Sequence, residues 1–301
     1  MKKIRSILDK LNLSFDTLEK IGNCYIIGTN KGKYVFKKNN YINKDKLFDY
    51  LDSRGFSFYL KPIYSDLDYD VYSYIEQSII TSSEKYCDMV NIISFLHTRT
   101  THYRNINISK IKDKYDDLKE QIISLKEYFY KVQDSIEEKE IMSPSEYLLI
   151  RNISFFYLCL NECSNYLEEW YKFIIDNNSE RVVTLHNNLK DSHLLVGKNS
   201  YLICWEKTFC SWPIYDLYNL FLNCYNICDY ESLFIIYNEK YPLFKVEILF
   251  LFVLLLLPKK IIKNSNEVVQ CQIIREHINM LQIARKFILN YRSKQKEEES
   301  P

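Results

Sequence analysis

The stretch that decides the fold is His186-Asn-Asn-Leu-Lys-Asp-Ser-His-Leu-Leu-Val196. A short apolar run, residues 182–185, precedes it, and a second one, residues 200–204, follows the turn at Gly197. Short apolar runs bounded by turn residues are typical of buried strands. The sequence therefore predicts two strands joined by a polar loop, and loops held by rigid strands are where binding and catalytic side chains concentrate.

The first 75 residues have the pattern of an α+β region. Residues 29–33 are expected to form a hairpin turn in which Gly32 takes a positive φ, with strands at 25–27 and 34–36 on either side. A short helix is expected at 45–51 and should end near Gly55, since glycine suits a helix C-terminus. Two further β-rich runs follow, at residues 63–64 and 71–75.

Beyond Glu76 the apolar residues recur every three or four positions, which indicates helices. Ser143, Pro144 and Glu146 have the spacing of a capping box at a helix start. We expect helices at 108–138 and 145–175 to pack antiparallel within one chain. Their predicted seam is Leu118, Ile122, Phe156, Leu160 and Trp170.

This change of pattern predicts the domain organisation. We expect an N-terminal lobe at residues 1–75, with an antiparallel sheet and one helix, and a helical C-terminal lobe at 76–293. The hinge would lie at 74–77, where strand character gives way to helix, and residues 294–301 would form a charged tail.

Composition and charge exclude several classes of protein. The 301 residues carry a formal net charge of +1, and a nucleic-acid-binding protein usually presents a strongly basic face. The longest apolar run, residues 248–257, is about half of what a bilayer span needs and stops at Pro258, so it reads as a buried helix. Neither a nucleic acid nor a membrane is expected as a partner.

The ends and the cysteines predict a cytoplasmic protein. Residues 1–15 mix charged and apolar residues and lack the apolar core of a signal peptide. Nine scattered cysteines in a chain of this length are best explained as reduced thiols. The pairs Cys159/Cys163 and Cys224/Cys228 are spaced four apart on predicted helices, which suits small buried residues better than metal ligands.

The loop at 186–196, together with Ile203-Cys-Trp205 and Asp216-Leu217, resembles the catalytic and metal-binding loops of aminoglycoside phosphotransferases and related kinase-like enzymes. Their pattern is His-Gly-Asp-Leu, an Asn five residues after the Asp, Ile-Asp-Trp or Ile-Asp-Phe on the next strand, and an Asp-Leu helix start. Upstream, Gly32-Lys-Tyr-Val-Phe-Lys37 and the helix ending at His97 are similar to the family's segments as well. The spore-coat CotS-type kinase-like proteins are the subfamily that the chain resembles most.

The resemblance implies a two-lobed kinase-like fold and assigns a role to each site position. Lys37, Tyr74 and Glu76 would contact a nucleotide, and His186 would hold the backbone of the loop. Asn188 stands where the family has its catalytic Asp, and Asn187 stands where it has glycine. The metal-binding positions are His193 and Cys204. The glutamate that usually pairs with the lysine is hard to place, and Asp49 is the nearest candidate.

The residues at these positions argue against phosphoryl transfer. That reaction needs a carboxylate to accept the proton of the attacking hydroxyl and oxygen ligands to hold Mg²⁺. The amide of Asn188 has no useful basicity, and the nitrogen and sulfur of His193 and Cys204 are poorly matched to Mg²⁺. ATP remains a candidate ligand, but bound Mg²⁺ is not expected.

Three interpretations follow, and the first is favoured. The chain is a pseudokinase that acts in binding or assembly, with a protein partner, a spore coat or a small molecule as its target. Alternatively, it is an active phosphotransferase in which carboxylates have moved: Asp191 lies three residues after Asn188, and Glu206 would share a strand face with Cys204. Least favoured is an α-rich interaction protein unrelated to kinases. A soft-metal site at His193, Cys204 and Cys210 is a further, weak alternative.

Overall fold

The computed structural model describes residues 2–39 and 44–298, which divide into two compact units. The first unit is made of residues 1–100 and 186–209, and the second of 101–185 and 210–301, within the residues described. The chain therefore returns to its first unit at the segment that opens with His186. The predicted lobes, 1–75 and 76–293, stay a prediction, because the units follow contacts rather than the order of the sequence.

The first unit is built on an antiparallel sheet of five strands in the order β1-β2-β3-β5-β4. The predicted hairpin is confirmed: β2 and β3 pair with Thr29 opposite Gly32, whose φ is 115°. The strands are β1 (Phe15–Ile21), β2 (Cys24–Thr29), β3 (Gly32–Lys38), β4 (Tyr64–Ser65) and β5 (Tyr69–Ser73).

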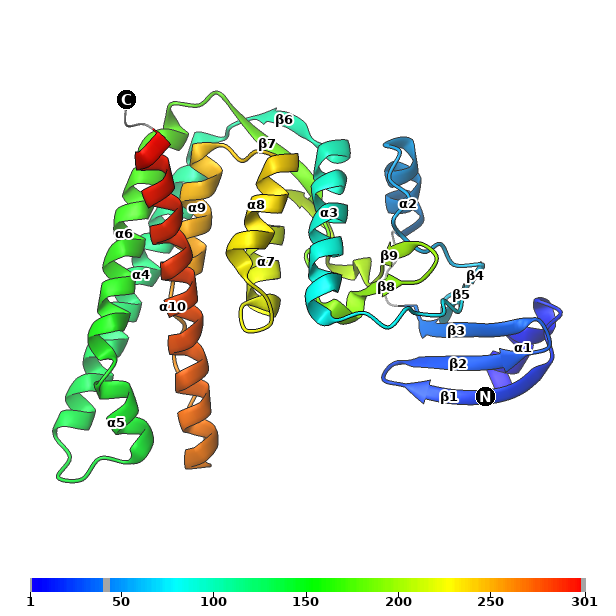
Figure 1. Ribbon diagram of the computed structural model, residues 1–301, viewed down its shortest axis with the longest axis horizontal. Helices are drawn as coiled ribbons and strands as arrows, with labels where there is room; N and C mark the ends of the chain where they lie inside the picture. The colour runs from blue at the N-terminus through cyan, green and yellow to red at the C-terminus, as the bar shows by residue number, and fades with distance from the viewer. Residues whose placement is uncertain (1, 40–43, 299–301) are drawn as a thin grey trace. The chain divides into compact units, whose positions relative to one another are not determined.

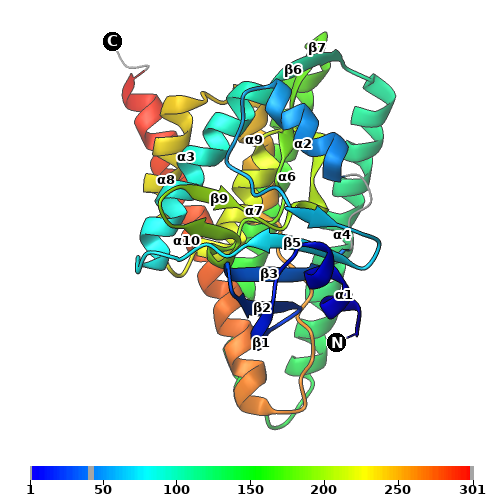
Figure 2. The same ribbon diagram turned by 90° about the vertical axis from the view of Figure 1, so that its right-hand side faces the viewer.

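One face of this sheet is covered by α1 (Lys2–Lys10), as Figure 2 shows. Apolar side chains of the helix, such as Ile4 and Leu8, are buried against Ile27, Phe36 and Val71 of the sheet. The alternation of side chains along a strand sends the intervening residues to the opposite face. The opposite face of the sheet is therefore not covered by α1. Neither α1 nor β1 was among the predicted elements.

The remaining elements of the first unit are helices and a short hairpin. The predicted short helix is confirmed as α2 (Lys44–Ser53), and α3 (Ser82–Thr100) follows β5. The returning segment contains η1 (Asp191–His193), β8 (Leu194–Val196), β9 (Ser200–Leu202) and η2 (Trp205–Lys207). The backbone N–H of Leu202 donates to the carbonyl of Phe58 at 2.8 Å, which fastens this segment to the chain before β4.

The second unit is mainly helical, and α4, α6, α9 and α10 lie side by side in it (Figure 1). The predicted antiparallel pair is confirmed by two ring contacts: Tyr115 stacks on Tyr171 at 4.2 Å, and Phe129 meets Phe156 at 4.8 Å. The helices of this unit are α4 (Ile108–Glu137), α5 (Pro144–Ile150), α6 (Ile153–Ile175), α7 (Ile214–Cys224), α8 (Tyr230–Lys240), α9 (Lys245–Leu256) and α10 (Glu267–Glu298).

Some details of the helices differ from the expectation. The helix predicted at 145–175 is broken at 151–152 into α5 and α6, although its capping box at Ser143 is present. Leu118 is only half-buried, whereas Ile122, Leu160 and Trp170 are buried. The charged tail expected from residue 294 is helical as far as Glu298, and residues 299–301 lie outside the described part of the chain.

The second unit also holds a small sheet in the order β10-β7-β6, with β6 (His102–Asn105), β7 (Ser179–Leu185) and β10 (Phe209–Ser211). The apolar run after Glu247 is the buried helix α9, as predicted. Across residues 2–39 and 44–298, no helix has both the length and the apolar character needed to cross a bilayer.

Candidate functional site

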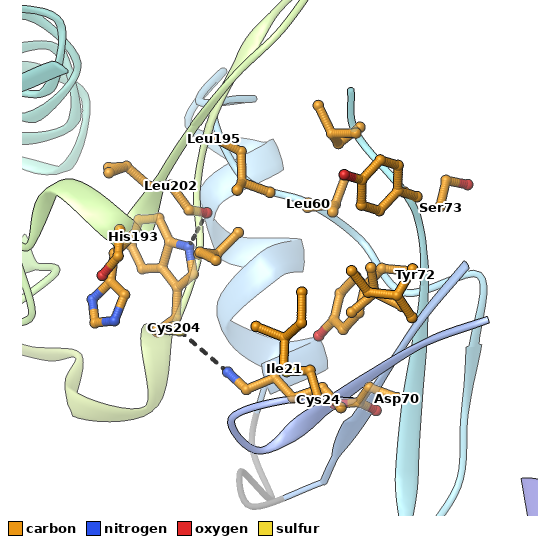
Figure 3. A pocket seen from close by; sticks show the side chains of 18 of the residues that line it. Ile21, Cys24, Leu60, Asp70, Tyr72, Ser73, His193, Leu195, Leu202 and Cys204 are labelled. Carbon is orange, nitrogen blue, oxygen red and sulfur yellow. Dashed lines mark hydrogen bonds between the residues drawn. The ribbon is translucent and has the colours of Figure 1, made fainter. Parts of the chain in front are cut away.

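The face of the five-stranded sheet that α1 leaves open forms one wall of a cavity of about 400 Å³ in the first unit. Strand residues that alternate with the buried face, such as Ile26 and Val35, line it from one side. Figure 3 shows His193, Leu195, Leu202 and Cys204 of the returning segment on the other side. The cavity is thus largely apolar and has polar groups gathered at one end, which is the usual make-up of a small-molecule site.

Lys37 is the central polar group of that end. It stands on β3 opposite Cys24 of β2 and Asp70 of β5. Its ammonium group donates to the carboxylate of Glu206 and lies 3.4 Å from the sulfur of Cys204. Burial alone would lower the pKa of Lys37, but the hydrogen bond to Glu206 and the nearby negative charges outweigh it and raise that pKa.

The ion pair with Glu206 corrects the expectation for Asp49. Asp49 is exposed on α2, and the carboxylate that pairs with Lys37 comes from η2 instead. Burial alone would raise the pKa of Glu206, but the hydrogen bond and the charge of Lys37 hold it below its usual value. The two side chains are 25% and 32% exposed, so the pair is shielded from much of the solvent.

Cys204 lies at a sharp turn of the backbone. The strand expected to run to residue 204 ends at Leu202, and Cys204 is left-handed, with φ 67° and ψ 54°. Glu206 therefore lies on a 3₁₀ turn and not on the same strand face as Cys204, which corrects that part of the sequence argument. A left-handed residue other than glycine costs about 1–2 kcal/mol, and such strain collects at functional sites.

His193 ties Cys204 to the loop. Its Nδ1–H donates to the backbone carbonyl of Asn188 at 2.7 Å, and its side chain also hydrogen-bonds to Cys204. The hydrogen bond with Cys204 is the main reason that the pKa of His193 is raised. Burial alone would raise the pKa of Cys204, but His193 and the charge of Lys37 together lower it. The sulfur is therefore biased toward the thiolate.

The side chains of the loop residues Asn187, Asn188 and His186 hydrogen-bond to backbone carbonyls near the cavity. Asn187 has φ 54°, a left-handed conformation that asparagine adopts more readily than most residues. The amide of Asn188 donates to the carbonyl of Cys204 at 3.3 Å. His186 is fully buried, and its Nε2–H donates to the carbonyl of Ile203 at 3.0 Å.

The other predicted site residues are placed around the cavity to different degrees. Tyr74 lines it, but Glu76 is exposed and does not. Asp191 accepts a hydrogen bond from the hydroxyl of Ser82 at 2.9 Å and is not among the residues that line the cavity. The structure therefore brings together Lys37, Glu206, His193 and Cys204, while Asp191 and Glu76 lie apart from them.

A second ion pair in the cavity wall has no counterpart in the sequence analysis. Lys44 of α2 donates to Asp70 of β5, and both side chains are 7% exposed. Ser65 completes the group, since its hydroxyl donates to Asp70 at 2.7 Å and accepts from Lys44 at 2.8 Å. The one available signal was Asp70 itself, a carboxylate within an otherwise apolar and aromatic strand.

The polar groups of the cavity do not fit a magnesium ion. Mg²⁺ takes oxygen ligands, and the two carboxylates lining the cavity, those of Glu206 and Asp70, each hold a lysine. In the described part of the chain, no group of three or more histidine, cysteine or acidic side chains is arranged to hold a metal ion.

Comparisons with known proteins identify the fold. No protein-family model matches the sequence, and no curated protein matches it. Among solved structures, an aminoglycoside phosphotransferase from Alicyclobacillus acidocaldarius is similar with a TM-score of 0.65 and 11% identity, over 94% of this chain and 93% of that one. Spectinomycin phosphotransferase, solved with ADP and spectinomycin, gives a TM-score of 0.56 at 14% identity, over 95% and 98%.

The choline kinase LicA from Streptococcus pneumoniae is a third similar structure, with a TM-score of 0.51, 18% identity and coverage of 96% of this chain and 99% of that one. These matches extend over nearly the whole chain. The predicted two-lobed, kinase-like α+β fold is therefore confirmed. At such low identity the similarity concerns the fold, and function has to be argued from the site.

Proposed function

We propose that the chain is a pseudokinase: a protein with the fold of an aminoglycoside phosphotransferase that binds a ligand or a partner and does not transfer phosphoryl groups. The observation that carries the proposal is the polar end of the cavity. Lys37, the candidate phosphate-contacting lysine, is paired with Glu206, and the two candidate metal positions are His193 and Cys204, which hydrogen-bond to each other.

The chemistry of phosphoryl transfer supports this proposal. A carboxylate that accepts the proton of the attacking hydroxyl contributes about 10²–10⁴-fold to such reactions, and the amide of Asn188 cannot replace it. Metal ions neutralise the charge that develops on the phosphates. Nitrogen and sulfur at His193 and Cys204 are poor ligands for Mg²⁺, so this contribution is lost as well.

The runner-up is an active phosphotransferase with displaced carboxylates. Glu206 favours it, because this carboxylate does reach the cavity. Against it, Glu206 is already engaged by Lys37, and Asp191 is held by Ser82 away from the residues that line the cavity. One residue would have to supply the base and another the metal ligand, and neither is placed for that task.

The finer assignment is also a proposal. Pro213-Ile-Tyr-Asp-Leu217 and Leu256-Leu-Pro-Lys-Lys260 resemble segments of the CotS-type spore-coat proteins. We propose that the chain belongs with them, that it is cytoplasmic before it joins a coat, and that its partner is another protein of that assembly. Co-purification with coat proteins from sporulating cells tests this step, and a chain recovered free of them contradicts it.

The test of the main proposal is a phosphotransfer assay with the purified chain. ATP with Mg²⁺ or Mn²⁺ is supplied together with aminoglycosides, choline and simple sugars, and we expect no product above the rate without protein. The triple variant Asn188→Asp, His193→Asn and Cys204→Asp should recover metal-dependent nucleotide binding before it recovers turnover. The proposal fails if the unmodified chain transfers phosphate and either Asp191→Asn or Glu206→Gln abolishes that activity.

A further inference from the structure

We infer that a second cavity, built entirely from the second unit, binds the phosphate group of a small phosphate monoester. Its volume is about 320 Å³, and every residue that lines it belongs to that unit. Lys110 and Lys114 of α4 line this second cavity, together with Arg104 of β6 and Glu180 of β7. The inference adds a ligand site to the protein and does not depend on the proposed function, because different residues carry it.

The charges of the second cavity do not balance within the protein. The Nε–H of Arg104 donates to one carboxylate oxygen of Glu180 at 2.5 Å, and the indole N–H of Trp212 donates to the other, also at 2.5 Å. Arg104 and Glu180 therefore neutralise each other. In the described part of the chain, neither Lys110 nor Lys114 forms an ion pair with a carboxylate. These two lysines leave the cavity with a net positive charge.

Lys114 is partly buried, and its ammonium group lies among aromatic rings. The ammonium nitrogen is 4.8 Å from the centre of the Trp212 ring and 5.1 Å from the centres of the Tyr215 and Phe250 rings. Aromatic faces attract a cation but carry no full negative charge. Burial lowers the pKa of Lys114, and the charge of Glu180 offsets this only in part. An anion bound in the cavity would supply the missing counter-charge.

The spacing of the two lysines suits a doubly charged ligand. Lys110 and Lys114 are four residues apart on α4, so their side chains emerge on the same face of the helix, one turn apart. Long side chains at this spacing can hold one group between them. A phosphate monoester carries nearly two negative charges at pH 7, which matches two ammonium groups.

The donors of the second cavity favour phosphate over carboxylate. A planar carboxylate matches the fork of an arginine, but Arg104 is already engaged by Glu180. A lysine ammonium is a compact charge with three rotatable donors, and it binds phosphate as a point charge. Neutral donors complete the lining, namely the side-chain amides of Asn105 and Asn107 and the hydroxyl of Ser211.

The volume of the second cavity leaves room for the organic part of an ester. About 320 Å³ lies within the range of small-molecule sites and is more than a phosphate ion fills. Ile111 and Trp212 also line the cavity and offer it apolar surface. Contact with these side chains removes apolar area of the ligand from water. An ester should therefore bind more tightly than inorganic phosphate.

The experiment is isothermal titration calorimetry of the full chain with phenyl phosphate, phenyl sulfate, phthalate and inorganic phosphate. We expect phenyl phosphate to bind most tightly of the four. Phenyl sulfate has a similar shape but one negative charge, and phthalate has two charges on planar groups. Each of these two should bind about tenfold more weakly, the size of one charge-assisted hydrogen bond. Inorganic phosphate should also bind more weakly, because it lacks the ring.

Lys110→Met should lower the affinity for phenyl phosphate about tenfold. Lys112→Met is the matched control, because Lys112 is an exposed lysine of the same helix that does not line the cavity. Its loss should change the affinity less than about threefold, since exposed charges are screened. Lys114→Met should lower the affinity at least as much as Lys110→Met. Circular dichroism establishes that the variants fold, and if Lys114→Met does not, the exposed position Lys110 decides.

Protection from acetylation locates the bound ester independently of the variants. The unmodified chain is treated with acetic anhydride, and peptide mapping by mass spectrometry gives the rate at each lysine. Saturating phenyl phosphate should slow the acetylation of Lys110 and Lys114 and leave the rate at Lys112 unchanged. Equal rates with and without the ester at all three lysines would contradict the assignment of the site.

The inference is overturned if phenyl phosphate does not bind, or if any of the other three ligands binds as tightly. Equal affinities in Lys110→Met and Lys112→Met would overturn it as well. A loss of affinity in Lys37→Met that is absent in Lys110→Met would place the ester in the cavity of the first unit, which also contradicts it. None of these results bears on phosphoryl transfer, which the product assay measures separately.

Discussion

Lys37 and Glu206 form an ion pair across 169 positions of sequence, between the end of strand β3 and the 3₁₀ turn that follows Cys204. The pair fastens the returning segment to the five-stranded sheet. It therefore joins two stretches of the first unit that the sequence separates widely.

The first prediction concerns the strength of this pair. A double-mutant cycle of Lys37→Met and Glu206→Gln should give a coupling free energy of about 1 kcal/mol in urea unfolding. This value is at the upper end of the range for exposed pairs, and we expect it because the two side chains are only 25% and 32% exposed. The exposed pair Lys3 and Asp68 is the control and should show no measurable coupling. Equal coupling in the two cycles would mean that the Lys37 pair is solvated.

The second prediction concerns the core of the helical unit. Leu160 of α6 is fully buried, so Leu160→Ala should lower the free energy of unfolding by about 2–5 kcal/mol. Leu158 on the same helix is 39% exposed, and Leu158→Ala should cost much less. Urea titration of both variants measures the difference. Similar losses at the two positions would show that the side of α6 that carries Leu160 is no more buried than the side that carries Leu158.

The third prediction is a dependence of stability on pH through His277. Burial and the charge of Lys259 lower the pKa of His277 to about 4. Its Nε2 accepts a hydrogen bond from the backbone N–H of Lys259 at 3.1 Å, which requires the neutral ring. Between pH 6.5 and about 4 the unfolded chain binds a proton that the folded chain refuses. Stability is therefore full above pH 6.5 and falls by about 2–3 kcal/mol as the pH drops to about 4.

The check on this third prediction is thermal unfolding across that range of pH. His277→Gln, which keeps an acceptor but does not titrate, should flatten the curve between pH 6.5 and 4. His102→Gln alters an exposed histidine and should leave the curve as it is. A His277→Gln curve as steep as that of the unmodified chain would assign the acid sensitivity to carboxylates.

The fourth prediction concerns the thiol of Cys204. Its pKa is lowered by His193 and Lys37, whereas burial raises the pKa of Cys24 in the same cavity. Because the thiolate is the reacting form, Cys204 should be alkylated by iodoacetamide at pH 7 about tenfold faster than Cys24. Peptide mapping by mass spectrometry gives both rates. Lys37→Met should slow Cys204, and equal rates at the two cysteines would contradict the prediction.

Local patterns in the sequence predicted the local structure well. Gly32 marked the β2–β3 turn, and Ser143 with Glu146 marked the start of α5. The short helix α1 was not predicted, although Ile4, Ile7 and Leu8 have the spacing of an apolar helix face and provided a usable signal for it. The break at 151–152 was missed because the apolar spacing continues across it.

The polar end of the cavity was predicted only in part, since its decisive contacts join residues far apart in the sequence. The candidate positions His193 and Cys204 do meet, but the pairing of Lys37 with Glu206 depends on the left-handed turn at Cys204. Glycine or asparagine in a sequence indicates such a left-handed turn, but cysteine does not. The pair of Lys44 and Asp70 was likewise invisible, because nothing near either residue in sequence indicates the other.

The left-handed backbone at residue 204 has a consequence for protein engineering. Aspartate and asparagine enter this conformation more readily than cysteine, because their short polar side chains bond to the local backbone. The backbone at 204 thus already has a conformation that aspartate tolerates better than cysteine does, and Asn187 has a left-handed conformation of the same kind. An aspartate can therefore be introduced at position 204 without a change in the local backbone conformation.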